Sequence, residues 1–544
     1  MLLVGINAKY IHSNLAIRYL SRIDSRCSFL EYTISDRADR IAAELYQTGQ
    51  RDIVFSSYIW NIELVYRVCE ILMKTDCGFR LGLAGPEVSF NPEEQLLTHP
   101  DVSFVLCGEG EPSISLLVDA LEDGSFQTVP GLWYRQAGEV VSSPLAPQEA
   151  VMDELPFPYT EEDIAALQNR LVYFETSRGC PYRCSFCLSG GAGSLRFLSL
   201  DKVAQAVAFF HAHNVPLVKL VDRTFNADPE RALSIINLIK SSGGSTCYHL
   251  EIRAESMTKP LISALQSAPK GMFQLEIGVQ STNAKTLQNI NRKPAVEALY
   301  SVVRALSEHH NMHLHLDLIA GLTGETLTEF VESFHNVIAL RPQALQLGFL
   351  KRLKGAALQL DGSAFSDFPP YEIIHSDAMS YEELLLLHAV EDVLDCYYNS
   401  GAYTETMKYL LDRYYPGREF EFFKEMASFL ERENVAGKAQ KARFEALYRF
   451  ACDKQFDVGV THRLIYDYCL THRDSLSFMK TEDGLKEKAF AFLKQPERVK
   501  LYFEQYAGIK PVVLYKKLRF VPIGNRVIAF DYDNAMAADV TAEF

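Results

Sequence analysis

The sequence contains little cysteine, a deficit of positive charge and no long apolar run. Its 11 cysteines among 544 residues are too few for a disulfide scaffold in a chain of this size. Lys and Arg total 54 against 69 Asp and Glu, which gives a formal net charge of −15. Because phosphate binding depends on Lys and Arg, this balance argues against a nucleic-acid partner, although a local basic groove stays open. No apolar run approaches the ~18 residues that would indicate a membrane span.

Export signals are missing as well. The first residues, MLLVGINAKY, have neither the basic region nor the small-residue cleavage site of a signal peptide. They are typical of a buried strand, and we expect a cytoplasmic location. Eight cysteines are scattered along the chain and are expected to be small buried apolar residues: Cys27, Cys69, Cys77, Cys107, Cys247, Cys396, Cys452 and Cys469.

Residues 1–141 alternate short apolar runs with helical stretches. The runs LLVGINA, DIVFSSY, LGLAG and VSFVLCG are typical of strands buried on both faces. The alternation predicts a Rossmann-like, doubly wound parallel sheet. Glycine and polar residues follow these strands at 56–58, 85–89 and 107–111, at the sheet edge where ligands bind. No Gly-x-Gly-x-x-Gly follows the first strand, which weakens a dinucleotide site.

The rest of the chain divides into three further parts. Residues 142–170 contain several prolines and are predicted to be an extended linker. Residues 171–370 resume the α/β alternation, with six strand candidates that predict a partial (β/α)6 TIM-type barrel whose chemistry lies at the carboxyl ends of the strands. Residues 371–544 are mostly helical and aromatic-rich, and we expect a separate accessory domain there. We find no repeats and no low-complexity segment.

The motif ETSRGCPYRCSFC follows the first barrel strand and places Cys180-x3-Cys184-x2-Cys187 on one loop. Thiolates are ligands of iron–sulfur clusters, and this spacing lets one loop wrap a [4Fe-4S] cubane. Three ligands for four irons leave one iron open to chelate the amino and carboxylate groups of S-adenosylmethionine (SAM). A structural zinc site needs a fourth ligand, usually Cys or His, and residues 171–200 contain none.

This segment resembles the signature of the radical SAM superfamily. The resemblance implies that an electron from the cluster breaks a C–S bond of SAM and yields a 5′-deoxyadenosyl radical. It also implies SAM contacts, with an aromatic ring against adenine, an arginine at the carboxylate and a glutamate at the ribose. The candidates lie on the cysteine loop and at the ends of successive strands: Phe186, Asp222, Glu251, Arg253, Glu276, Gln280, Ser281 and Gly321. For any one of them, an ordinary core or ion-pair role is the alternative.

A Rossmann-like domain before such a barrel resembles the cobalamin-dependent subgroup of the superfamily. The resemblance implies that strand-end residues of the first domain bind cobalamin: Ser57, Gly85, Pro86, Glu87, Gly108, Glu109 and Gly110. Many cobalamin domains place an Asp-x-His-x-x-Gly motif after the first strand. The matching loop here, Tyr10 to Leu15, has His12 but neither the Asp nor the Gly. His12 is therefore either a cobalt ligand or, as we expect, a histidine that begins a helix or makes a hydrogen bond.

The subgroup's usual reaction is methyl transfer from SAM through cobalt to an unactivated carbon. By resemblance we expect this reaction on an unknown small molecule or peptide, with an external electron donor such as flavodoxin or ferredoxin. Three alternatives remain. One is ring formation or rearrangement without methyl transfer. Another is a tRNA methylthiotransferase, in which Cys27, Cys69 and Cys107 would hold a second cluster, although their sequence contexts do not match. The last is a cobalamin-binding sensor without catalysis.

Overall fold

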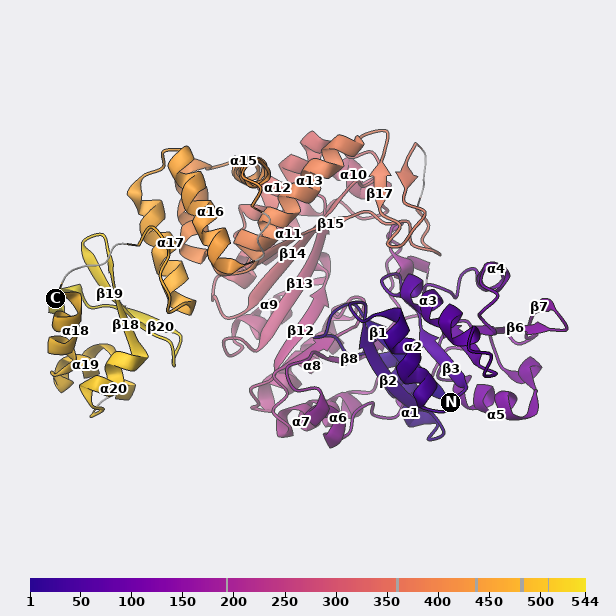
Figure 1. Ribbon diagram of the computed structural model, residues 1–544. Coiled ribbons are helices and arrows are strands. Elements are labelled where there is room, and N and C mark those ends of the chain that lie inside the picture. The colour runs from indigo at the N-terminus through magenta and orange to yellow at the C-terminus, as the bar shows by residue number, and fades with distance from the viewer. Residues whose placement is uncertain (192–193, 359–361, 436–438, 480–483, 507) are drawn as a thin grey trace. The chain divides into compact units, whose positions relative to one another are not determined.

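The computed structural model describes the chain except for residues 192–193, 359–361, 436–438, 480–483 and 507. The chain forms two compact units (Figure 1). Unit 1 comprises Met1–Ser333 and Leu347–Leu384, and unit 2 comprises residues 334–346 and 385–544. Among the described residues, no helix is long and apolar enough to cross a membrane.

The N-terminal part of unit 1 is a seven-stranded sheet in the order β2-β1-β3-β4-β5-β6-β7. β1 to β5 are parallel, as the sequence predicts. The order reverses between β1 and β3, and this switch point is where an open α/β sheet binds ligands. The strands are β1 (Leu2–Asn7), β2 (Ser28–Thr33), β3 (Asp52–Ser56), β4 (Arg80–Ala84), β5 (Phe104–Leu106), β6 (Leu132–Gln136) and β7 (Glu139–Ser142).

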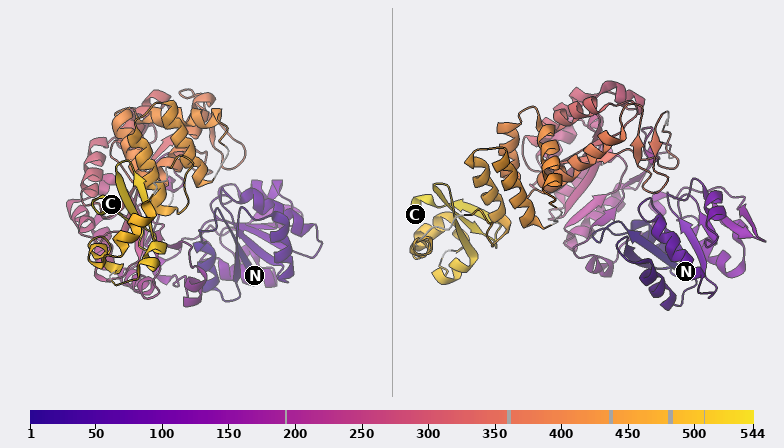
Figure 2. Two further views of the ribbon diagram at one scale, coloured as in Figure 1. Left: turned by 60° about the vertical axis from the view of Figure 1, so that its left-hand side comes forward. Right: turned by 45° about the horizontal axis from the view of Figure 1, so that its top comes forward.

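Helices cover both faces of this sheet (Figure 2). One apolar cluster takes residues from α2, α3 and α4, and the other takes residues from α1 and α5. All six residues of β1 are consequently buried. The helices are α1 (Leu15–Ile23), α2 (Ala38–Gln47), α3 (Ile62–Met73), α4 (Pro92–Thr98) and α5 (Ile114–Asp123).

The antiparallel hairpin of β6 and β7 was not predicted. Its two-residue turn is Ala137–Gly138, and both residues have positive φ, 51° and 91°. This is the type I′ geometry that suits the twist of a hairpin. The sequence signal is weak because alanine rather than Asn or Asp occupies the first turn position. The predicted linker also contains a short helix, α6 (Glu161–Ala166), which begins at a capping box of Thr160 and Asp163.

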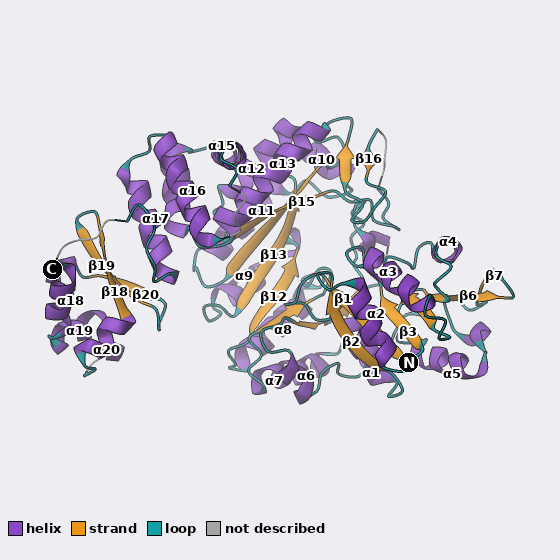
Figure 3. Ribbon diagram, viewed as in Figure 1, coloured by secondary structure: helices purple, strands orange, loops and turns teal. Residues whose placement is uncertain are grey.

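The second part of unit 1 carries a six-stranded sheet in the order β15-β14-β13-β12-β11-β8 (Figure 3). The pairs from β8 to β14 are parallel. All six predicted strands are present, so the predicted partial barrel is confirmed. They are β8 (Val172–Phe174), β11 (Leu217–Leu220), β12 (Cys247–Ile252), β13 (Phe273–Gln280), β14 (His313–Ala320) and β15 (Ala344–Phe349).

Burial alternates along these barrel strands. In β13 every second residue is buried and the others are partly exposed. One face of the sheet therefore packs against helices, and the opposite face, which we call the open face, carries the polar residues of each strand. The helices of this part are α7 (Leu200–Ala212), α8 (Pro229–Ser241), α9 (Lys259–Gln266), α10 (Ala284–Asn289), α11 (Val296–Ser307) and α12 (Leu327–Ile338). The short strands β9 (Ser177–Arg178) and β10 (Arg196–Phe197) pair beside the cysteine loop, and β16 (Ala364–Phe365) pairs with β17 (Ile373–His375).

Unit 2 is mainly helical, as predicted for this region, and ends in a small antiparallel sheet. The strands of that sheet are β18 (Leu518–Ile523), β19 (Arg526–Asp531) and β20 (Met536–Asp539). Its apolar core is shared with α18, α19 and α20. The helices are α13 (Tyr381–Val393), α14 (Thr404–Tyr414), α15 (Glu419–Arg432), α16 (Gln440–Asp453), α17 (Val458–Thr471), α18 (Leu485–Leu493), α19 (Pro496–Tyr502) and α20 (Pro511–Lys517).

Candidate functional site

The cysteine loop lies at the carboxyl end of the barrel, directly after β9. Cys180, Cys184 and Cys187 are free thiols, and each is partly exposed. The loop is tightly turned, because the backbone N–H of Cys187 donates to the carbonyl of Cys184 at 3.1 Å. Gly179 enters the loop with φ +89°, where a Cβ atom would meet the carbonyl oxygen of Ser194 at 2.7 Å. Only glycine fits this position without displacing the backbone.

Asp222 anchors the base of that loop. Its carboxylate accepts hydrogen bonds from the backbone N–H of Thr176 at 3.0 Å, the Thr176 hydroxyl at 3.1 Å and the Ser177 hydroxyl at 2.5 Å. Burial raises the pKa of Asp222 to about 6, although the hydrogen bonds from Ser177 and Thr176 oppose the rise. The carboxylate thus fixes the two residues that lead into β9. Its role as a SAM contact stays a prediction.

Arg253 lies against the cysteine loop. Its guanidinium carbon is 3.9 Å from the centroid of the Tyr182 ring, and its Nε donates to Glu255 at 3.2 Å. The backbone N–H of Arg253 donates to the side chain of Asn226, which in turn donates to the Arg253 carbonyl, both at 2.8 Å. These paired bonds lock the ends of β11 and β12 together. A fixed guanidinium beside the cysteines fits the carboxylate of SAM.

Burial and two nearby arginines, Arg253 and Arg292, affect the pKa of Cys184. Burial raises the pKa of the Cys184 thiol, while the positive charges of Arg292 and Arg253 act in the opposite direction. Arg292 itself is 8% exposed and donates to the carbonyl of Gly278 at 2.9 Å. The net pKa of Cys184 is raised, and the two arginines reduce the cost of forming the thiolate that an iron–sulfur cluster needs. Neither Arg292 nor Tyr182 was predicted, because isolated residues in loops carry no periodic or motif signal.

The open face carries a chain of charged side chains across β11, β12 and β13. Lys219 Nζ lies 3.3 Å from Glu251 and 3.0 Å from Glu276, and His249 Nε2 lies 2.9 Å from Glu276. Burial disfavours the charged form of Glu276, but the His249 hydrogen bond and Lys219 outweigh it and lower its pKa to about 2. Glu251 and Glu276 both pair with Lys219, and their roles in SAM binding stay predictions. Lys219 and His249 were not predicted, although both lie at positions of the predicted strands that face the open face.

Gln280, at the end of β13, has the geometry of a ligand contact. Its φ is +71°, a conformation that a residue other than glycine adopts at an energetic cost. Its side-chain oxygen is buried and has no hydrogen-bond partner among the described residues. The β13–β14 register shifts at this point, between Gly278 and Gln280. A strained residue with an unsatisfied buried acceptor fits a site that a polar ligand completes.

The remaining predicted SAM contacts lie at the same end of the barrel. Ser281 is buried and donates from its hydroxyl to Glu325. Gly321 has φ +80°, and a Cβ atom there would meet Ile373 at 2.9 Å. Phe186 is partly buried within the cysteine loop. These three placements leave the predicted roles in SAM binding untested.

The predicted cobalamin residues of the N-terminal sheet have partners within unit 1. Glu87 accepts from Tyr371 Oη at 2.6 Å and pairs with Lys354 Nζ at 2.9 Å. Glu109 pairs with Arg178 at 3.0 Å and also with Arg196, and it accepts from the backbone of Ala150. A Cβ atom on Gly85 would meet Ser57, on Gly108 it would meet Pro147, and on Gly110 it would meet Leu20; Pro86 is partly exposed. Cobalamin contacts by this set stay predictions.

Exposed aromatic side chains occupy the same strand ends and were not predicted. Tyr10 follows β1, Trp60 follows β3 and Phe90 follows β4, with exposed fractions of 70%, 45% and 51%. Trp60 stacks on Tyr58 with ring centroids 4.4 Å apart. Tyr10 and Trp60 follow the two strands that flank the switch point, and exposed aromatic side chains there suit a flat apolar ligand. Single aromatic residues in loops are too common for sequence reasoning to single them out.

His12 lies in the loop after β1. Its Nδ1 is 2.5 Å from the hydroxyl oxygen of Tyr173 on β8. Burial and the nearby charges of Lys9, Lys219 and Arg170 lower the pKa of His12. The lowered pKa favours the neutral imidazole, and Nδ1 makes a hydrogen bond with Tyr173. The question of cobalt ligation stays open.

No three His, Cys, Asp or Glu side chains in the described part of the chain are arranged to hold a single metal ion. A cubane cluster does not need such an arrangement, because each cysteine binds a different iron. The partly exposed thiols and the adjacent arginines of the cysteine loop suit a [4Fe-4S] cluster.

Two regions of the chain match known families. Residues 174–337 match the family described as "Radical SAM superfamily", which includes all three cysteines of the loop. Residues 362–540 match the family described as "Protein of unknown function (DUF4080)". The chain thus contains a region that matches the radical SAM superfamily, followed by a region that matches that second family, and both matches agree with the sequence-based recognition.

The chain is also similar to individual curated proteins and solved structures. The "Cobalamin-dependent radical SAM methyltransferase TokK" of Streptomyces tokunonensis is 26% identical over 303 residues, which cover 53% of this chain and 44% of that protein. The chain spans about half the length of the curated relatives it matches. Among solved structures, the cobalamin-dependent SAM radical enzyme OxsB has a TM-score of 0.59 at 16% identity, covering 86% of this chain and 79% of its own. The radical SAM methyltransferase TsrM from Kitasatospora setae has a TM-score of 0.56 at 15% identity, covering 68% and 80%. At these identities the structural likeness concerns the fold.

Proposed function

We propose that this protein is a cobalamin-dependent radical SAM enzyme that methylates an unactivated carbon of a small molecule or peptide. The observation that carries the proposal is the cysteine loop at the carboxyl edge of an open-faced barrel sheet, with Arg253 against the loop and the unsatisfied Gln280 at the end of β13. The methyltransferases among the sequence relatives, TokK included, support the choice of reaction.

The barrel sheet of unit 1 would hold the cluster and SAM, and the N-terminal sheet would hold cobalamin. Cys180, Cys184 and Cys187 would hold a [4Fe-4S] cluster, and Arg253 and Gln280 would bind and orient SAM next to it. Tyr10, Trp60 and Phe90 would seat cobalamin at the edge of the N-terminal sheet. When bound, the cluster with SAM supplies a carbon-centred radical and cobalamin supplies a transferable methyl group. The open face of the barrel would hold the substrate close to both and exclude water from it.

An electron donor is needed for every turnover, and we assign this role to an external flavodoxin or ferredoxin. A reduced cluster requires a reducing compartment, so we place the protein in the cytoplasm. The methylthiotransferase alternative is disfavoured by the positions of the cysteines. Cys69 and Cys107 belong to one apolar cluster of the N-terminal domain and Cys27 to the other, so they lie on opposite faces of the sheet. They are not arranged to share a second cluster.

SAM labelled with deuterium in its methyl group tests the reaction. The anaerobically reconstituted protein, supplied with cobalamin and a strong reductant, is incubated with a metabolite extract and the products are analysed by mass spectrometry. The proposal expects label in a product carbon, with both 5′-deoxyadenosine and S-adenosylhomocysteine formed. An unlabelled product formed together with 5′-deoxyadenosine would replace methyl transfer by ring formation or rearrangement.

A further inference from the structure

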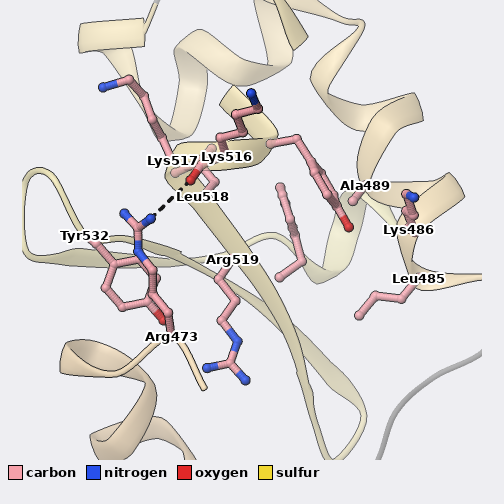
Figure 4. Close-up of a pocket in the computed structure, with 11 residues that line it drawn as sticks. Arg473, Leu485, Lys486, Ala489, Lys516, Lys517, Leu518, Arg519 and Tyr532 are labelled. Atoms are coloured by element: carbon pink, nitrogen blue, oxygen red, sulfur yellow. Dashed lines mark hydrogen bonds between the residues drawn. The ribbon is translucent and has the colours of Figure 1, made fainter. Parts of the chain in front are cut away.

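A pocket of about 280 Å³ lies in unit 2, close to the C-terminus (Figure 4). Its walls come from the first turns of α18, the end of α20, the start of β18 and two loops. The lining residues are Arg473, Leu485, Lys486, Ala489, Tyr515, Lys516, Lys517, Leu518, Arg519, Phe520 and Tyr532. Five of these eleven side chains are cationic and none is acidic, in a chain whose formal net charge is −15.

Two of the cations are held in fixed positions. Arg519 donates to the carbonyls of His472 at 3.0 Å and Asp474 at 2.8 Å, and to the Ser475 hydroxyl at 2.9 Å. These partners fix the guanidinium, and all three are neutral groups that leave its charge uncompensated. Arg473 lies over the Tyr532 ring with 4.7 Å between its guanidinium carbon and the ring centroid, as Figure 4 shows.

The lysines differ in how they are compensated. Lys517 pairs with Asp533, which also lies 4.0 Å from Arg473. Lys486 and Lys516 are exposed and have no ion-pair partner among the described residues. The cavity therefore combines rigid guanidinium groups with lysines that are free to rotate toward a ligand. Among the described residues that line it, the charge is positive.

From this arrangement we propose that unit 2 binds a compact polyanion, a phosphate ester or pyrophosphate, in this pocket. Guanidinium and ammonium groups together are the usual partners of phosphoryl oxygens. Several cations around a small volume favour a ligand with at least two negative charges over a single carboxylate. Stacking of a nucleobase is disfavoured at two of the three aromatic rings of the lining, because Phe490 stacks on Tyr515 and Arg473 covers Tyr532. Recognition is thus directed at the phosphoryl group itself.

This site is independent of the cysteine loop and of the proposed reaction. The test uses the full-length reconstituted protein and inorganic pyrophosphate as the probe, titrated by calorimetry at low ionic strength. The variant Lys486→Gln/Lys516→Gln removes both lysines that lack an ion-pair partner. The control variant Lys494→Gln/Lys500→Gln removes the same charge from exposed positions that do not line the pocket.

We expect saturable binding of pyrophosphate that weakens by about tenfold or more in the first variant and changes little in the control. Inorganic phosphate should bind more weakly than pyrophosphate at the same site. Equal weakening in both variants would show attraction by net charge alone and would overturn the proposal. So would absence of saturable binding, or binding of citrate as tight as that of pyrophosphate. SAM cleavage should be unchanged in either variant, so failure here does not bear on the proposed reaction.

Discussion

The two large sheets of unit 1 contain similar parallel βα units but are buried differently. In the N-terminal sheet every residue of β1 is buried, because helices cover both faces. In the barrel sheet β13 alternates between buried and partly exposed residues, because only one face is covered. The N-terminal sheet, which is covered on both faces, can bind a ligand only through its strand-end loops. The open sheet presents polar side chains along its strands as well, and it is there that Lys219, His249 and Glu276 form their network.

The largest expected effect of this difference in burial is on stability, and two side-chain truncations test it. Phe55 on β3 is fully buried in the N-terminal sheet, whereas Gln274 on β13 lies on the open face and is partly exposed. Phe55→Ala should lower the free energy of unfolding by roughly 3–5 kcal/mol, because it removes a large buried side chain and leaves a cavity. Gln274→Ala should cost less than about 1 kcal/mol. Urea unfolding followed by circular dichroism measures both, and equal losses would contradict the assignment of an open face.

The next effect concerns ligand binding rather than stability. Arg253→Ala should weaken SAM binding by roughly 10- to 100-fold, because a charged hydrogen bond to the SAM carboxylate is lost. Arg253→Lys should recover part of the affinity, since it keeps the charge without the planar fork. Arg304→Ala on the exposed side of α11 is the control. Equilibrium dialysis with SAM measures the affinity, and unchanged binding in Arg253→Ala would remove this arginine from the site.

A smaller effect depends on pH. Burial and the charge of Glu329 raise the pKa of Glu325 from 4.5 to about 8, against the hydrogen bond from Ser281. The folded state therefore holds a proton that the unfolded chain releases, so the stability contributed by this group is lost as the pH rises from about 4.5 to about 8. Glu325→Gln cannot titrate. Its melting temperature relative to the wild type should increase between pH 5 and pH 8, and a constant difference would contradict the raised pKa.

The smallest expected effect is none at all. We predict that His12 does not bind cobalt, because its loop lacks the Asp and the Gly of the Asp-x-His-x-x-Gly motif. Electron paramagnetic resonance of the cob(II)alamin form should show no nitrogen splitting from the protein, and His12→Ala should leave the spectrum unchanged. Splitting that disappears in the variant would make His12 the lower ligand.

Much of this molecule was predictable because its signals are periodic or tightly spaced. Apolar runs identified all six barrel strands, and the cysteine spacing identified the loop. The hairpin at Ala137–Gly138 was missed, since its turn lacks the usual Asn or Asp. β2 was also missed, because five of its six residues are only partly buried and its apolar pattern is weak.

Site residues on the predicted strands could be identified from the sequence, whereas contacts between different segments could not. Glu251 and Glu276 follow from their positions on predicted strands. The dependence of Cys184 on Arg292, the ring of Tyr182 under Arg253 and the exposed Trp60 arise from contacts between segments distant in sequence. Such contacts depend on how the strands are ordered, which the sequence pattern does not specify.

The cysteine loop is the central claim, and SAM cleavage tests it most directly. The wild type and the variant Cys180→Ala/Cys184→Ala/Cys187→Ala are reconstituted without oxygen and given SAM and a strong reductant. The account predicts a brown protein that releases 5′-deoxyadenosine in the wild type, and a colourless protein that releases none in the variant. Equal release of 5′-deoxyadenosine by both proteins would contradict the assignment.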